Sequence, residues 1–136
     1  MKFIILFFGF FSIIIISTII YKIPVNIISY SNDNITKIII EGKSTNEYLS
    51  IEDTSTIGSV VNSLQKEKFI RQNFNMKNIG YNVHISFLKD DTVLDTLIIH
   101  SDNLIQKNST TYKLQNSKSI KYILTLLEEQ LKRPSK

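Results

Sequence analysis

The two histidines are the side chains best suited to proton transfer, because an unperturbed imidazole titrates near neutral pH. They are His84 and His100, in neighbouring segments that alternate between apolar and polar residues as strands do. If Leu88 faces Val93 across the intervening turn, alternation places the histidines on opposite faces of the sheet. Neither histidine has the i, i+4 or His-x-His spacing that is typical of zinc sites. The sequence therefore predicts no histidine pair for catalysis and no metal site.

Adjacent acidic residues stand where a carboxylate has a structural use. They are Asp90 and Asp91 in a predicted turn, Glu128 and Glu129 on a helix surface, and Glu52 and Asp53 before a helix. Residues 55–59 contain one glycine and no lysine at the spacing of a phosphate-binding loop. The chain has no cysteine, so no thiolate can act as nucleophile or metal ligand. We expect no catalytic residue and no cofactor.

Phe74 and Met76 are the candidate partner-binding residues. They interrupt the polar stretch of residues 73–78, which is expected to be a loop. Apolar side chains in such a loop either fill a gap in the core or present an anchor to a partner. The sequence leaves both interpretations open.

The region after the apolar N terminus predicts a hairpin and then a helix. Residues 35–41 are rich in β-branched side chains, and turn-forming residues separate them from a second strand at residues 47–52. A helix should follow, because apolar residues recur at i, i+3, i+4 and i+7. These apolar residues are Ile57, Val60, Val61 and Leu64. We expect this helix to begin at the capping residues 53–55 and to end at Lys68 or Phe69.

The second half of the chain predicts four strands and a closing helix. The strands are at residues 81–88, 92–100, 103–106 and 111–115, joined by short turns that favour an antiparallel meander. An apolar stripe after residue 116 predicts a helix that ends before Pro134. The expected fold class is α+β, in the order β-β-α-β-β-β-β-α, with an antiparallel sheet packed against helices.

The register of the hairpin around Lys89 depends on Asp95. Pairing Leu88 with Val93 keeps Asp95 away from the core, whereas a shift by one residue places it beside Ile85. An unpaired charge among apolar side chains costs on the order of several kcal/mol. We therefore expect the first register along the whole hairpin.

Residues 3–20 are a continuous uncharged segment of mostly Phe, Ile and Leu. A helix of this length reaches roughly 27 Å, close to the roughly 30 Å hydrocarbon core of a bilayer. The segment exceeds the apolar region of a typical signal peptide, and no small-x-small cleavage site follows it. We expect residues 1–22 to be an uncleaved transmembrane signal anchor. The alternative is a cleaved signal that releases a secreted protein.

The short N-terminal tail predicts the orientation of this anchor. Two residues before a first apolar segment are typical of chains that keep the N terminus in the cytoplasm and export the remainder. Residues 23–34 are expected to be a linker, and residues 35–136 a soluble extracytoplasmic domain of a single-pass membrane protein. The charges of Lys2 and Lys22 on the two sides nearly cancel, so charge alone does not set the orientation.

The exported part of the chain is nearly neutral. Its basic residues are the sixteen of the whole chain less Lys2 and Lys22, which leaves fourteen against twelve acidic residues. Its two arginines, Arg71 and Arg133, are far apart, and no run of like charges occurs. This distribution lacks the basic patch that nucleic-acid binding requires, so we expect no nucleic-acid partner.

Several hydrophobic spacings resemble those of small exported domains of unknown function that are common in AT-rich Gram-positive bacteria. The residues that carry the resemblance are Ile51, Asp53 and Ile57 before a helix, Tyr81 at the start of a strand, and Tyr112 in a later short strand. The resemblance covers roughly residues 35–130. It implies an α+β domain and a location in the cell envelope, and it carries over no catalytic residue. Many of those domains are lipoproteins, whereas this chain has no cysteine to carry a lipid.

These features predict a membrane-anchored, extracytoplasmic binding domain without enzymatic activity, of the inhibitor or immunity type. It would contact the membrane through residues 3–20 and recognise a protein or an envelope ligand through its sheet or through the loop that contains Phe74 and Met76. One alternative is an accessory or sensor subunit of a membrane complex, which acts through its transmembrane helix. A second alternative is an envelope hydrolase that uses His84 or His100.

Overall fold

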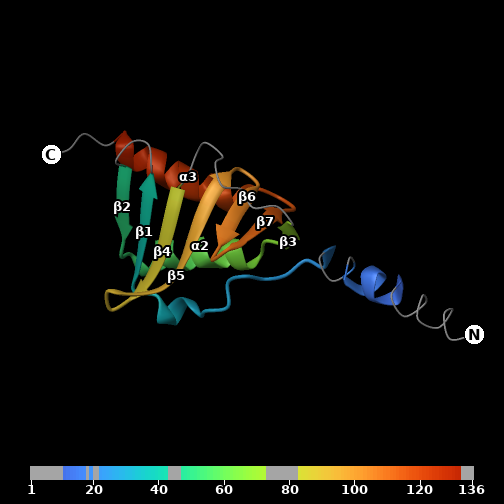
Figure 1. The fold of residues 1–136 in the computed structure, drawn as a ribbon. Helices are drawn as coiled ribbons and strands as arrows, with labels where there is room; N and C mark the ends of the chain where they lie inside the picture. Colours follow the sequence, from blue (N-terminus) through green and yellow to red (C-terminus); the bar gives the residue numbers. More distant parts are fainter. Residues whose placement is uncertain (1–10, 18, 20–21, 43–46, 73–82, 133–136) are drawn as a thin grey trace, which may run out of the picture.

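A computed structural model describes residues 11–17, 19, 22–42, 47–72 and 83–132 of the chain (Figure 1). Its elements are η1 (Asn32–Asn34), β1 (Lys37–Gly42), β2 (Glu47–Ile51), α2 (Thr54–Gln65), β3 (Phe69–Gln72), β4 (Val83–Lys89), β5 (Thr92–Ser101), β6 (Leu104–Lys107), β7 (Thr110–Leu114) and α3 (Lys118–Leu131). The expected α+β class and the antiparallel sheet are confirmed.

The strands of the described residues form one seven-stranded sheet in the order β2-β1-β4-β5-β6-β7-β3. All neighbouring strands pair antiparallel. Two pairings join strands that are not consecutive in the chain, β1 with β4 and β3 with β7. Figure 1 shows α2 and α3 on the same face of this sheet, where they contact each other.

Alternating residues of the strands and one face of each helix build the core between the two layers. The apolar stripe predicted for α2 is confirmed, since Ile57, Val60, Val61 and Leu64 are all buried. The stripe of α3 is buried through Ile120, Ile123 and Leu127. Helical periodicity therefore identified the inner faces of both helices.

Strand β3 was not predicted, and its presence adds a fifth strand after α2. We expected the helix to continue to Lys68 or Phe69, but α2 ends at Gln65 and Phe69 begins β3. The Phe69 side chain is fully buried, and its ring packs edge-on against Tyr112 with 6.5 Å between ring centroids. Pairing with β7 decides the conformation here, and that strand is far away in sequence.

The predicted register of the β4–β5 hairpin is correct at the turn and wrong beyond it. Leu88 pairs with Val93 as expected, and a bulge then shifts the pairing by one residue. Phe87 consequently pairs with Asp95, which places this carboxylate on the face that carries the core. A bulge of this kind inserts one unpaired residue into a strand and exchanges the faces beyond it.

Asp95 is tolerated there because it is paired. Its Oδ2 atom lies 2.5 Å from Lys107 Nζ and accepts a hydrogen bond from the Tyr30 hydroxyl. Lys107 Nζ also donates to the carbonyl oxygen of Ile27 at 2.6 Å. The Asp95 and Lys107 side chains are only 10% and 19% exposed. The sequence argument treated Asp95 as unpaired, whereas the fold supplies a cation and a hydroxyl from distant segments.

The segment expected to be a linker, residues 23–34, packs on the domain from Val25 onwards. Val25 and Phe69 exchange two backbone hydrogen bonds, with N to O distances of 2.8 and 3.2 Å. Ile27 and Ile28 are buried in the core. Apolar burial thus fastens this segment to the sheet, and the folded domain begins before residue 35.

Residues 11–17 of the N-terminal apolar segment lie apart from the sheet and its helices (Figure 1). Residues 11–17 are helical, and the large apolar side chains between residues 11 and 19 are 46–67% exposed. In the described part of the chain, no helix has both the length and the apolar character needed to cross a membrane. Residues 1–10, 18, 20 and 21 of the expected anchor lie outside the described residues.

Asp53 caps the N terminus of α2 and carries a perturbed pKa. Its Oδ2 atom accepts hydrogen bonds from the Ser55 hydroxyl at 2.6 Å, the Thr56 amide at 2.8 Å and the Thr56 hydroxyl at 2.6 Å. These bonds, led by that of Ser55, lower the pKa of Asp53 from 3.8 to about 2. The lowered pKa means that the ionised carboxylate stabilises the fold above the unfolded-state pKa.

We expect Asp53→Asn to reduce stability at pH 7, by a difference that shrinks as the pH falls from 3.8 toward 2. The contribution of the carboxylate is complete above the unfolded pKa of 3.8 and is lost as pH falls through the folded pKa of about 2. The measurement is the urea midpoint of both proteins between pH 7 and pH 2. Asp102→Asn, at an exposed turn position, is the matched control. A gap between the Asp53→Asn variant and the original that stays constant with pH would contradict this assignment.

Candidate functional site

The candidate partner-binding residues Phe74 and Met76 lie outside the described residues, as does the rest of the expected loop. Their role stays a prediction.

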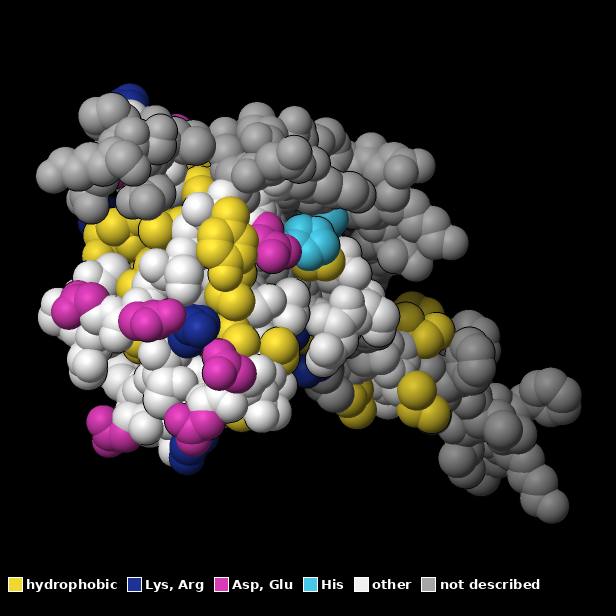
Figure 2. Space-filling model, turned by 90° about the vertical axis from the view of Figure 1, so that its left-hand side faces the viewer, with side chains coloured by type: hydrophobic (Ala, Val, Ile, Leu, Met, Phe, Trp, Pro, Cys, Tyr) yellow, Lys and Arg dark blue, Asp and Glu magenta, His cyan; other side chains and the backbone are white. Residues whose placement is uncertain are grey.

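The histidines lie on one face of the sheet, so the expectation of opposite faces is wrong. The bulge pairs His84 with Ile98, and Ile98 in turn pairs with Gln106, whose side chain is hydrogen-bonded to His100. A second irregularity between Ile99 and Ser101 interrupts the alternation of β5 at His100. Glu41 pairs with His84 from β1, and Figure 2 shows histidine (cyan) beside an acidic side chain (magenta). His100 is 6% exposed, and its Nε2 atom lies 3.0 Å from the Gln106 amide oxygen.

This histidine face has few groups that could hold a metal ion. Within the described residues, no three His, Asp or Glu side chains converge as metal ligands would. His84 has one carboxylate neighbour across the strands, and His100 is hydrogen-bonded to an amide.

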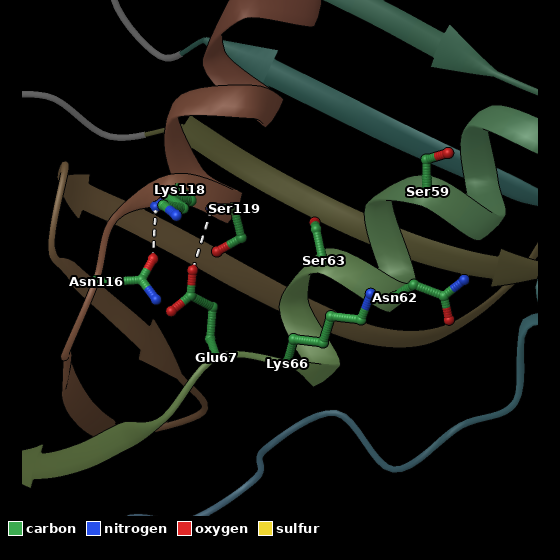
Figure 3. Close-up of a pocket in the computed structure, with 8 residues that line it drawn as sticks. All are labelled: Ser59, Asn62, Ser63, Lys66, Glu67, Asn116, Lys118 and Ser119. Atoms are coloured by element: carbon green, nitrogen blue, oxygen red, sulfur yellow. Dashed lines mark hydrogen bonds between the residues drawn. The ribbon is translucent and has the colours of Figure 1, made fainter.

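A groove of about 470 Å³ lies between the C-terminal half of α2 and the start of α3 (Figure 3). All of its lining side chains are polar or charged. They are Ser59, Asn62, Ser63, Lys66, Glu67, Asn116, Lys118 and Ser119. We call this feature the α2–α3 groove.

Pairing of β3 with β7 brings the two sides of the α2–α3 groove together, namely the residues after α2 and the residues before α3. Phe69 of β3 pairs with Leu114 of β7, and the Gln115 amide donates to the Lys68 carbonyl at 3.1 Å. Because this pairing is antiparallel, the residues just before Phe69 lie opposite those just after Leu114. Glu67 is thereby placed at the first turn of α3. The sequence prediction omitted β3, so it could not place Glu67 beside this helix.

Glu67 is the buried charged residue of the groove. Its side chain is 3% exposed, and Oε1 accepts a hydrogen bond of 3.1 Å from the Ser119 amide. The other carboxylate oxygen, Oε2, is buried and has no hydrogen-bond partner among the described residues. The Ser119 hydroxyl is also buried and has no hydrogen-bond partner among the described residues. In Figure 3 the Glu67 carboxylate points toward the start of α3.

The N terminus of α3 is already capped by side chains. The Ser119 amide is bound by Glu67, and the Lys118 amide donates to Asn116 Oδ1 at 3.0 Å. A negatively charged carboxylate at this position also complements the helix dipole. The helix terminus therefore offers little to a further anion.

The hydroxyl groups of two other lining residues are engaged within α2. Ser59 and Ser63 donate their hydroxyls to the carbonyls of Ser55 and Val60 within α2, at 2.9 and 2.7 Å. Neither histidine lines the groove, so no serine there has an imidazole base beside it. The ammonium groups of the two lining lysines and the carboxylate of Glu67 provide charges of both signs.

No protein-family model, curated protein or solved structure matches this chain.

Proposed function

We propose that this protein is a membrane-tethered, non-enzymatic binding domain, in which residues 3–20 hold the α+β domain at the outer side of a membrane. The observation that carries the proposal is the exposure of the apolar N-terminal segment. Its exposed side chains are Phe11, Ile13, Ile14, Ile15, Ile16 and Ile19. A cluster of this kind on an otherwise folded protein marks a contact with an apolar partner.

The folded domain does not need this segment for its own core. The buried core begins at Ile27, and no described residue before Val25 packs against it. Burying a large aliphatic side chain is worth roughly 1.5–3 kcal/mol, so several exposed isoleucines strongly favour an apolar environment. A bilayer provides that environment for an uncharged segment as long as residues 3–20.

The binding role is supported by the α2–α3 groove. It combines a buried carboxylate with two lysines and lacks a nucleophile paired with a base. Such a site can orient a small polar ligand. It has no evident means of breaking a bond in that ligand.

The alternative of a sensor or accessory subunit is favoured by the way the domain is attached. Val25 is bonded to Phe69, and Ile27 is bonded to Lys107, so the chain after the apolar segment is fastened to the sheet. A displacement of the apolar helix would therefore reach the domain directly. Exchanging residues 3–20 for an unrelated apolar helix separates the two functions, because only the sensor alternative requires the native segment.

We expect the full chain to sediment with membranes and to resist extraction at alkaline pH. Deleting residues 3–20 should move nearly all of the protein into the soluble fraction, because the apolar contact area is lost. The measurement is the fraction of protein in the membrane pellet after ultracentrifugation and a carbonate wash.

The matched control replaces exposed apolar residues elsewhere. Val93→Ser and Leu94→Ser, in the β4–β5 hairpin, should leave the pelleted fraction unchanged. Release of the full chain by carbonate, or a soluble full chain, would refute the tethering.

A further inference from the structure

We infer that the α2–α3 groove binds a free α-amino acid, with its ammonium group beside Glu67 and its carboxylate between Lys66 and Lys118. This inference deepens the binding half of the proposed function and rests on it. It names a small zwitterion as the ligand class.

The unsatisfied carboxylate oxygen of Glu67 defines the donor side of the ligand. A buried charge is costly unless its hydrogen-bonding capacity is used. Oε1 is used by the Ser119 amide, whereas Oε2 and the Ser119 hydroxyl have no hydrogen-bond partner in the described part of the chain. An ammonium group carries three N–H donors and a positive charge. It can therefore donate hydrogen bonds to Glu67 Oε2 and to the Ser119 hydroxyl oxygen, and it can neutralise the carboxylate.

The anionic side of the ligand belongs with the lysines. The Lys118 and Ser119 amides at the start of α3 are occupied by Asn116 and Glu67, so these two backbone donors are not available to an anion. Lys66 and Lys118 line the groove and are both exposed, so their ammonium groups are available to a carboxylate. A purely anionic ligand would meet the repulsion of Glu67, which a zwitterion avoids.

Other ligand classes fit the lining less well. Sugars are usually held against aromatic rings, and no aromatic side chain lines the α2–α3 groove. A divalent metal ion requires several acidic or imidazole ligands, and Glu67 is the single such side chain among the lining residues. The volume of about 470 Å³ lies within the range of small-molecule sites.

The simplest competing explanation is an ordered water. One water could donate to both Glu67 Oε2 and the Ser119 hydroxyl and so satisfy these buried atoms. A water gives no role to the two lysines, and it predicts no dependence on the charges of an added ligand. The experiment distinguishes the two explanations.

The test is calorimetric titration of the full chain in detergent micelles with each of the twenty standard amino acids. We expect at least one to bind with a Kd below about 1 mM. The N-acetyl and carboxamide derivatives of the best binder should each bind about tenfold more weakly, because a hydrogen bond to a charged group is lost.

Variants locate the site. Glu67→Gln should weaken binding about tenfold, and Lys118→Met, which changes an exposed side chain, should also weaken it. Glu128→Gln, an exposed position later in α3, is the matched control and should leave the Kd unchanged. Circular dichroism checks that each variant is folded. Since Lys118→Met alters no buried group, it keeps the test decisive if Glu67→Gln does not fold.

Several results would overturn the inference. They are the absence of binding by any amino acid up to about 10 mM, equal binding of the N-acetyl derivative, or an unchanged Kd in folded Glu67→Gln and Lys118→Met. A crystal structure soaked with the best binder that holds only water at Glu67 would do the same. If no amino acid binds, the fraction of protein that sediments with membranes is unaffected. Failure of this inference and failure of the tethering are therefore distinguishable.

Discussion

Lys107→Met is expected to lower the free energy of unfolding by about 3 kcal/mol, because it leaves a buried carboxylate without its cation. Asp95 and Lys107 are both largely shielded from water, and their charged atoms are 2.5 Å apart. The substitution also removes the hydrogen bond from Lys107 to the Ile27 carbonyl. Urea unfolding at pH 7, followed by far-UV circular dichroism, measures the loss.

A double substitution and a surface control test the cause. Asp95→Leu combined with Lys107→Met should recover most of the lost stability, because replacing both charges with apolar groups removes the unpaired ion. Lys37→Met removes an ammonium group that bridges exposed Asp91 and Glu52 and should change the urea midpoint only slightly. A Lys107→Met variant no less stable than Lys37→Met would show that the buried pair does not hold the register.

A chain that starts at Asn32 is expected to be less stable than one that starts at Ile23 by about 4 kcal/mol. The shorter chain lacks Ile27 and Ile28, and burying each is worth roughly 1.5–3 kcal/mol. It also lacks Tyr30, whose hydroxyl is bonded to Asp95. Both chains omit the apolar segment, so their unfolding can be compared in water without detergent.

The internal control for this truncation is a chain that starts at Ile23 and carries Ile23→Ser. Ile23 is exposed, so its replacement should leave the urea midpoint unchanged. Equal stability of the chains starting at Ile23 and Asn32 would mean that residues 23–31 act as a linker after all. The predicted difference would instead place the start of the domain immediately after the apolar segment.

Local patterns predicted most of the secondary structure. The stripe at Ile57, Val60, Val61 and Leu64 identified the buried face of α2, and the stripe from residue 120 identified that of α3. The β1–β2 and β4–β5 hairpins were expected from β-branched runs around turn residues. These features depend on neighbours within a few residues, so the sequence records them directly.

The candidate site was beyond the reach of the same reasoning. Glu67 carries no local signal, because it follows a helix in a stretch of charged residues. Its burial depends on β3 pairing with β7, which brings it to the start of α3. Strand β3 is too short to show a clear strand pattern in the sequence. The apolar spacing of α2 continues into it, so the helix was predicted to extend that far.

By itself, the sequence determined the α+β class, the inner faces of both helices and the uncharged character of residues 3–20, because each is a property of consecutive residues. The tertiary structure alone decided three features that depend on long-range partners. The bulge is tolerated because Lys107 and Tyr30 bind the Asp95 carboxylate. The expected linker is part of the core because Ile27 and Ile28 are buried there. The α2–α3 groove exists because β3 pairs with β7. The energy of a buried group is set by what surrounds it in space, which one-dimensional patterns do not contain.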